Sequence, residues 1–341
     1  MASSMLPLVR AGILVPFAAL LDELGLASWK YLEAERLLPE PQGNVEELVP
    51  FLSVLNLTER VSRATGIEDL GYVVGARSSL AVLGNFGNML VKSVSLSQAL
   101  HKVVAAVSLF NSGEFIWLRR EGDSVLMCHD FSVPDRKGRW HGDCFAMLRF
   151  IDLVGLAAPP GWVPDAVYVR PADFVHRKRY ADLFKTRIEL GGNYCGIKFD
   201  ASLLAAPLKP QRGEAVDVGM GGELASTAPL LDLTGSVRQA VTSLLHSGFP
   251  DLGFVAELTG MSTRNLQRHL KSEGLSYSQI VDESRFEIAR RLLEETDLKL
   301  IDVAFEAGYG EPANFTRAFK RWAGMAPKTF KRLLAPSKTT N

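Results

Sequence analysis

The sequence is poor in the features that mark secreted, membrane-spanning or strongly charged proteins. It has only three cysteines, widely spaced, which excludes a disulfide framework or a Cys-x-x-Cys metal knuckle and favours a reducing cytoplasm. The apolar stretch at residues 11–21 is about half a membrane span and contains Pro16, so we expect a buried helix rather than a targeting signal. The 38 basic and 38 acidic residues cancel, so the whole chain is not a polycation for nucleic acid or membranes.

Motifs of the common enzyme classes are missing as well. No Gly-x-Ser-x-Gly, P-loop or His-Glu-x-x-His pattern occurs in the chain. His141 and Cys144 have the spacing of half a metal site, but no second pair of ligands accompanies them. We therefore predict no metal, no cofactor and no catalytic residue.

Composition divides the chain into two regions. Residues 207–230 are rich in proline and glycine, including a Gly-Met-Gly-Gly run, and favour a linker between a domain at 1–206 and a domain at 231–341. The first region predicts an α+β fold. Its expected helices are 48–64, 96–109 with Ser97 as N-cap, 144–156 and 179–184, and its expected strands are 115–119, 124–128, 167–169 and 197–199, with a turn at Gly122-Asp123.

The second region predicts helices throughout and contains an internal repeat, at residues 254–271 and 301–320. Each copy has Val-Ala, a glycine four residues after the alanine, and then two apolar residues four positions apart. In the first copy these are Ala256, Gly260, Leu266 and Leu270, and in the second they are Ala304, Gly308, Phe315 and Phe319.

The repeated residues suit a helix-turn-helix. Two helices that cross steeply need a small residue at the crossing, which Ala256 and Ala304 provide. A glycine can end the first helix in the left-handed conformation, and Ser262 can cap the second. The apolar pair then turns one face of that second helix to the core and leaves the opposite face for a DNA groove.

The outward faces predict DNA contacts. Arginine can read a guanine edge and glutamine an adenine edge, while residues farther along each helix suit phosphates. The predicted contacts are Ser262, Thr263, Arg264, Gln267 and Arg268 in the first copy, and Pro312, Ala313, Asn314, Arg317, Lys320 and Arg321 in the second. No acidic residue follows Glu311, so the charged side chains at the end of the chain are all basic. This fits either an anionic partner or a solvated tail.

The segment between the copies sets their spacing. Residues 277–295 have helical periodicity, and 19 residues at 1.5 Å each span roughly 28 Å, close to the ~34 Å of one DNA turn. One chain could then place two recognition helices in successive major grooves. The alternative is an ordinary helical bundle whose polar faces meet water, but a repeat of this kind argues against it.

The second region resembles the DNA-binding domain of the AraC/XylS family of bacterial transcription regulators. The resemblance is carried by Ile301, Gly308, Tyr309, Phe315, Phe319, Lys320, Gly324, Pro327, Phe330 and Lys331. Phe330 and Lys331 stand where the family commonly has Tyr and Arg. Pro312 and Ala313 occupy base-reading positions without a side chain that can hydrogen-bond a base, so direct readout by the second helix is expected to be weak.

The first region resembles the arabinose-binding-type sensing domain of one AraC branch. The carrying residues are 24–26, 70–72, 97–100, 180–184, Phe199, Asp200 and Leu203. The resemblance implies a cytoplasmic regulator that binds promoter DNA, a small-molecule effector of unknown identity and RNA polymerase, and that could form a homodimer, with no membrane partner. Activation is the commoner role in the family, and repression is the alternative.

Two further alternatives belong to other classes of protein. A DNA-repair methyltransferase fused to a DNA-binding module would need an activated cysteine in a Pro-Cys-His-like setting, which none of Cys128, Cys144 and Cys195 has. A structural nucleoid protein would bind with little sequence preference, unlike a protein with two base-reading helices.

Overall fold

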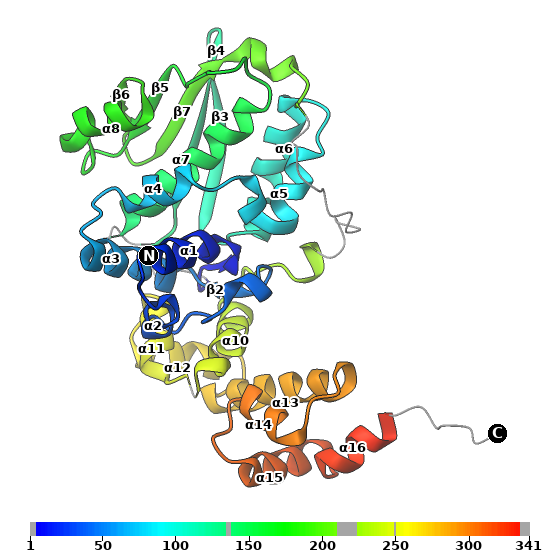
Figure 1. The fold of residues 1–341 in the computed structure, drawn as a ribbon. Coiled ribbons are helices and arrows are strands. Elements are labelled where there is room, and N and C mark those ends of the chain that lie inside the picture. The colour runs from blue at the N-terminus through cyan, green and yellow to red at the C-terminus, as the bar shows by residue number, and fades with distance from the viewer. Residues whose placement is uncertain (1–4, 134–137, 210–223, 249, 335–341) are drawn as a thin grey trace. The chain divides into compact units, whose positions relative to one another are not determined.

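The computed structural model describes residues 5–133, 138–209, 224–248 and 250–334 (Figure 1). The chain divides into two compact units: Pro7–Leu230, and Leu231–Asn341 with the first six residues. Most of the linker predicted at 207–230 falls on 210–223, outside the described residues. Farther along, the buried Arg10 guanidinium donates hydrogen bonds to the Leu224 carbonyl and to the Thr227 hydroxyl, within the first unit.

The first unit combines helices with a five-stranded sheet, which confirms the α+β prediction (Figure 1). The sheet order is β3-β4-β7-β5-β6, antiparallel except for β5 and β6. Its strands are β3 (Glu114–Glu121), β4 (Ser124–Phe131), β5 (Ala166–Val169), β6 (Ile188–Leu190) and β7 (Cys195–Asp200). The predicted hairpin turn is confirmed, since Glu121 pairs with Ser124 across Gly122-Asp123.

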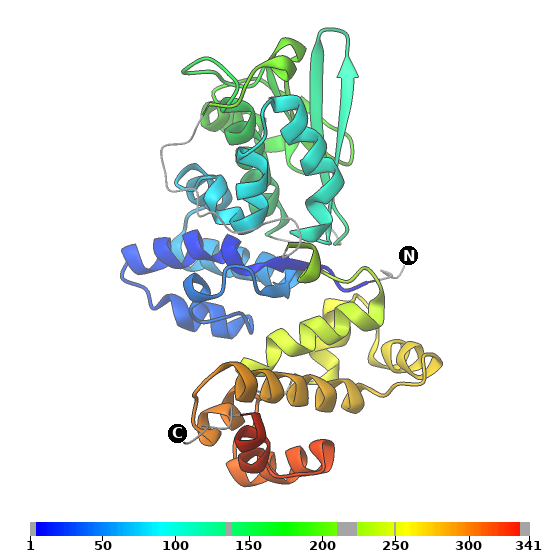
Figure 2. The ribbon, with the colours of Figure 1, turned by 90° about the vertical axis from the view of Figure 1, so that its right-hand side faces the viewer.

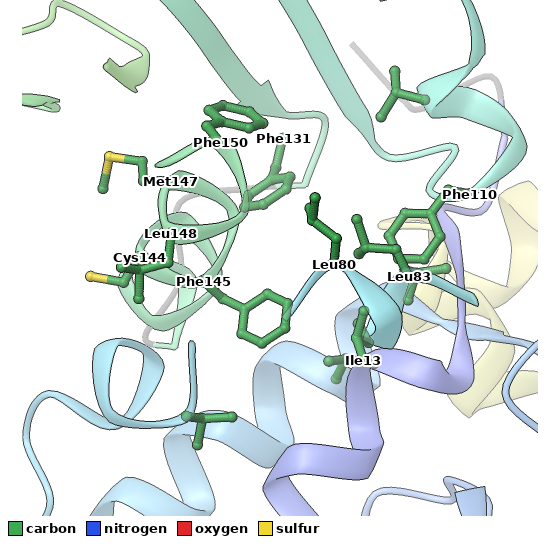
Figure 3. Close-up of a cluster of buried hydrophobic side chains, with 14 of the residues drawn as sticks. Ile13, Leu80, Leu83, Phe110, Phe131, Cys144, Phe145, Met147, Leu148 and Phe150 are labelled. Carbon is green, nitrogen blue, oxygen red and sulfur yellow. The ribbon is translucent and has the colours of Figure 1, made fainter. Parts of the chain in front are cut away.

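Helix α7 (Arg139–Gly155) connects the sheet to the remaining helices, because it contacts β7, α3 and α4. Figure 3 shows its side chains Phe145 and Phe150 on one side of a buried cluster that also contains Leu80, Leu83 and Ile13. The other helices are α1 (Val15–Glu23), α2 (Ser28–Ala34), α3 (Phe51–Thr65), α4 (Leu70–Ala76), α5 (Gly84–Val91), α6 (Leu96–Ala106) and α8 (Arg177–Phe184).

Two local predictions in this unit were wrong, and a third, the buried helix at residues 11–21, was wrong only in its first turn. Residues 48–50 form a strand, β2 (Leu48–Pro50), and not the first turn of a helix, because they pair with β1 (Leu8–Arg10) and a residue before proline avoids the helical region. Ser95, not Ser97, caps α6: its hydroxyl accepts a hydrogen bond from the backbone N–H of Gln98. Residues 11–14 form a 3-10 turn, so α1 begins only at Val15 and has Pro16 in its first turn, where a missing N–H costs nothing.

Every element described in the second unit is a helix, which confirms the all-α prediction. The helices are α10 (Leu233–Leu244), α11 (Leu252–Leu258), α12 (Thr263–Ser272), α13 (Tyr277–Glu295), α14 (Leu300–Glu306), α15 (Pro312–Ala323) and α16 (Pro327–Leu334). Figures 1 and 2 both show α13 lying between α10–α12 on one side and α14–α16 on the other. The long helix α13 therefore joins two groups of three helices with a similar arrangement.

Candidate nucleic-acid interface and effector cavity

The first helix-turn-helix consists of α11 and α12. Its turn passes through Gly260, whose φ of +69° is the left-handed conformation that glycine adopts without strain. The Ser262 hydroxyl then accepts a hydrogen bond from the backbone N–H of Asn265 at 3.3 Å and so caps α12. Ala256 is buried beside the turn, and Leu266 and Leu270 are fully buried. These contacts fix the direction in which α12 leaves the core.

The second helix-turn-helix consists of α14 and α15 and has the same plan. Gly308 has a φ of +75°, and Ala304, Phe315 and Phe319 are fully or almost fully buried. The start of the recognition helix differs, however. Glu311 stands at the N-cap without a side-chain cap bond, and Pro312 opens the helix instead, where its missing N–H costs nothing.

Both recognition helices turn a polar face outward. Thr263, Arg264, Gln267 and Arg268 are exposed on α12, and Ala313, Asn314, Arg317, Lys320 and Arg321 are exposed on α15, while Pro312 is half-buried. On α15 the Arg317 guanidinium donates to the Asn314 amide oxygen at 2.6 Å. Arg321 lies 3.5 Å from a carboxylate oxygen of Asp282 on α13. The predicted residues thus gather on two solvent-facing strips.

Helix α13 holds the second helix-turn-helix through Arg285. This guanidinium donates to the Gly308 carbonyl at 2.8 Å and lies 4.4 Å from the centre of the Tyr309 ring. The centre of the Phe286 ring, also on α13, lies 5.5 Å from the ring centre of Phe319 and 5.6 Å from that of Trp322. The turn and α15 are therefore attached to a rigid spacer rather than to a loop.

The first unit contains an apolar cavity of about 80 Å³. Its wall is formed largely by aliphatic and aromatic side chains from α3, α5, α6, α7, β3 and the segment around Leu80, with Val9 from β1. The few polar side chains on the wall are Thr58, Asn111, Glu114 and Arg149. Sequence reasoning named no effector-binding residue. One signal was available: Arg149 is a lone basic residue in the apolar run 144–154 of α7.

A buried polar network lies beside this cavity. Nδ1 of His129 is 3.4 Å from a carboxylate oxygen of Glu114, and its Nε2 is 3.9 Å from an oxygen of Asp143. Asp143 in turn lies 2.9 Å from the Arg170 guanidinium and 3.9 Å from Nε of Arg139. Burial raises the pKa of Asp143, against the opposing effect of His129 and the two arginines.

This network contains the one geometric candidate for a metal site among the described residues. Ligand atoms of His129, Asp143 and Cys195 lie within 4.8 Å of one another. Arg170 already neutralises the Asp143 carboxylate, and burial raises the pKa of the Cys195 thiol well above its usual value, so the donor set suits an internal ion pair better than a cation. His141, from the pair weighed in the sequence, instead accepts from the Gly71 amide at 3.3 Å.

Together these features define a protein with two kinds of unit: a double helix-turn-helix of the type that binds DNA, and an α+β unit with an apolar cavity. The comparisons with known proteins agree. Residues 25–208, more than half of the 341, match the family model described as the arabinose-binding domain of AraC transcription regulators, and residues 255–333 match a helix-turn-helix domain. The chain belongs to the AraC family of transcription regulators and is a DNA-binding regulator of transcription with a ligand-binding type of N-terminal domain.

Relatives match along almost the whole chain. The ornithine utilization regulator of Pseudomonas aeruginosa is 26% identical over 347 residues, which covers 95% of this chain and 98% of that protein. The regulator VirS of Mycobacterium tuberculosis is 21% identical and covers 95% and 96%. The crystal structure of the regulator CdpR from Pseudomonas aeruginosa has 20% identity and a TM-score of 0.42, with 89% of this chain and 96% of that one covered. Among the described residues, no helix combines the length and the apolarity needed to span a membrane.

Proposed function

We propose that this regulator reads two successive major grooves of a promoter, one with α12 and one with α15. The observation that supports this most is the repeated pattern of exposure: in each helix an apolar pair is buried and the polar side chains opposite it face solvent. The 19-residue α13 between them spans roughly 28 Å, close to one turn of DNA.

The two helices have different tasks in this proposal. Arg264, Gln267 and Arg268 read base edges from α12, with Ser262 and Thr263 near the backbone. On α15, Pro312 and Ala313 can meet only apolar groups such as a thymine methyl. Asn314 and Arg317, already bonded to each other, present one joint polar surface. Lys320 and Arg321 face phosphates, and Arg321 would exchange its exposed pair with Asp282 for DNA.

Residues 1–206 act as the sensing domain in this proposal, 207–230 as the linker and 231–341 as the DNA-binding domain. The start of the chain suggests how an effector could be sensed. The Leu6 amide donates to the Ser236 hydroxyl on α10 at 2.8 Å, within the second unit. Three residues later, Val9 lines the cavity of the first unit. A ligand that moves Val9 would therefore act on the chain segment that continues to Leu6.

We infer activation as the mode of regulation, through contact with RNA polymerase in the cytoplasm, with repression as the alternative and a homodimer as one arrangement. A catalytic role is disfavoured by the thiols. Cys128, Cys144 and Cys195 are all buried, and burial raises the pKa of Cys128 to about 12. A nucleophilic cysteine needs a lowered pKa and access to substrate.

The test is footprinting and titration of the target promoter with Arg264→Ala and Arg268→Ala. Each loss of a base contact should cost about 1–3 kcal/mol and relax the base preference at one position. Arg290→Ala is the matched control, because Arg290 is an exposed arginine on α13 that pairs with Glu287 and Glu294. Unchanged footprints and affinities for the two α12 variants would disprove the assignment.

A further inference from the structure

The cavity of the first unit has one feature that its apolar wall does not explain, the side chain of Arg149. This residue is only 5% exposed and comes from the middle of α7. Its Nη2 donates to the Gly75 carbonyl and lies 3.0 Å from an oxygen of Asp152. Its Nε and Nη1 are buried and have no hydrogen-bond acceptor among the described residues. A buried charged donor left unpaired is strongly unfavourable.

The two donors belong to a residue of the cavity wall, where a ligand could satisfy them. Arg149 lines the cavity, and its guanidinium carbon lies 5.1 Å from the centre of the Phe145 ring, which lines the cavity too. The remaining wall near it is apolar, so a ligand that fills the cavity must present hydrocarbon to most of the wall and one acceptor to Arg149. We propose that the effector is a compact apolar carboxylate whose carboxylate accepts from Arg149.

Charge selects a single carboxylate over other polar groups. Asp152 already balances part of the Arg149 charge, which leaves room for a monoanion but not for a phosphate dianion. An amine would offer further donors to a guanidinium that already lacks acceptors. Glu114, the acidic residue on the same wall, is turned to the His129 ring at 3.4 Å. An ordered water could also satisfy the guanidinium, and that outcome is separated below.

Size limits the apolar part of the ligand. The cavity of about 80 Å³ is about half of the ~150 Å³ engineered cavity that takes benzene. A short aliphatic acid therefore fits best, and a benzoate-sized ring would need the walls to move. The inference rests on the proposed sensing role and adds the chemical class of the effector.

The experiment measures binding of acetate, propionate, butyrate and benzoate to the full chain by calorimetry and thermal shift. The matched amides, of the same shape without the charge, are the ligand controls. We expect an acid of two to four carbons to bind about tenfold to a hundredfold more tightly than its amide, the range of a charge-assisted hydrogen bond. Equal binding of acid and amide would overturn the assignment, as would failure of every acid in the series.

Two variants locate the binding. Arg149→Met keeps much of the side-chain volume and should abolish the preference for acid over amide. Arg77→Gln, a change at an exposed arginine at the end of α4 that pairs with Glu23, should leave it unchanged. If Arg149→Met does not fold, the acid–amide comparison in the unchanged protein still decides.

The outcomes also separate this inference from the proposed function. If other metabolites alter promoter binding and do so equally in Arg149→Met, the sensing role stands and the carboxylate assignment is wrong. If an acid binds but promoter binding never responds to it, the site is real and the sensing role fails. If neither the acids nor a wider metabolite panel bind, water satisfies the guanidinium and both proposals fail.

Discussion

The two turn glycines offer a matched pair of substitutions that tests how α15 is fixed. Gly260 and Gly308 both have positive φ, so an alanine at either position pays roughly 1–2 kcal/mol for the left-handed conformation. A Cβ at Gly260 would meet nothing within 4 Å. A Cβ at Gly308 would lie 3.1 Å from both the Cδ2 and the carbonyl oxygen of Leu245, so the turn must also shift.

The extra crowding should make Gly308→Ala the more harmful change. Overpacking of this kind costs about 1–3 kcal/mol, which adds to the backbone cost that the two variants share. The lower entropy of alanine in the unfolded chain is also common to both and cancels in the comparison. We therefore expect Gly260→Ala to destabilise its turn by about 1–2 kcal/mol and Gly308→Ala by about 2–5 kcal/mol.

Hydrogen exchange followed by mass spectrometry measures this difference locally. Peptides from α14 and α15 should lose protection in Gly308→Ala, and those from α11 and α12 should lose less in Gly260→Ala. Because α15 begins at Pro312, four residues after Gly308, promoter contacts in the second groove should weaken with it. Equal loss of protection in the two variants would refute the packing argument.

Three further changes test separate parts of the structure. Arg285→Met removes the bond to the Gly308 carbonyl and the stacking on Tyr309, and should lower local stability of α14–α15 by about 1–3 kcal/mol, measured by the same exchange experiment. Burial raises the pKa of Asp152 to about 6, so the stability that its protonated form contributes is present below about pH 4 and is lost as the pH rises through 6. Asp152→Asn should remove that loss. If Tm changed with pH in the same way in the two proteins between pH 4 and 7, this explanation would be contradicted. Ser236→Ala removes the acceptor of the Leu6 amide and should reduce the effector response, in a promoter-binding assay with and without ligand, while binding without ligand stays the same.

The sequence was sufficient for the second unit because its signals are local. Gly260, Gly308 and Ser262 act through their own backbone and caps, and the buried pairs repeat at helical spacing, so α11 to α15 follow from the pattern. The bounds of α13, expected at 277–295, were confirmed as Tyr277–Glu295. The assignment of individual residues to bases stays a prediction, since it depends on DNA.

The first unit could be predicted only in class, because its decisive contacts join distant residues. Leu48–Pro50 became a strand through pairing with Leu8–Arg10, some forty residues away, which no local pattern indicates. The cavity likewise draws its wall from many segments between Val9 and Leu153. Arg149 was visible as a charge in an apolar helix, but whether it faced solvent, an acid or a cavity required the fold.

The most direct test of the central claim is the spacing of promoter contacts made by one chain. Hydroxyl-radical and methylation footprints should show two protected major-groove segments on one face of the DNA, about 10–10.5 base pairs apart. Inserting five base pairs between them should abolish binding by one of the two helices, and inserting a full turn should not restore it, because the 19-residue α13 has a fixed length. A single protected segment, or affinity that is indifferent to the five-base-pair insertion, would contradict the account.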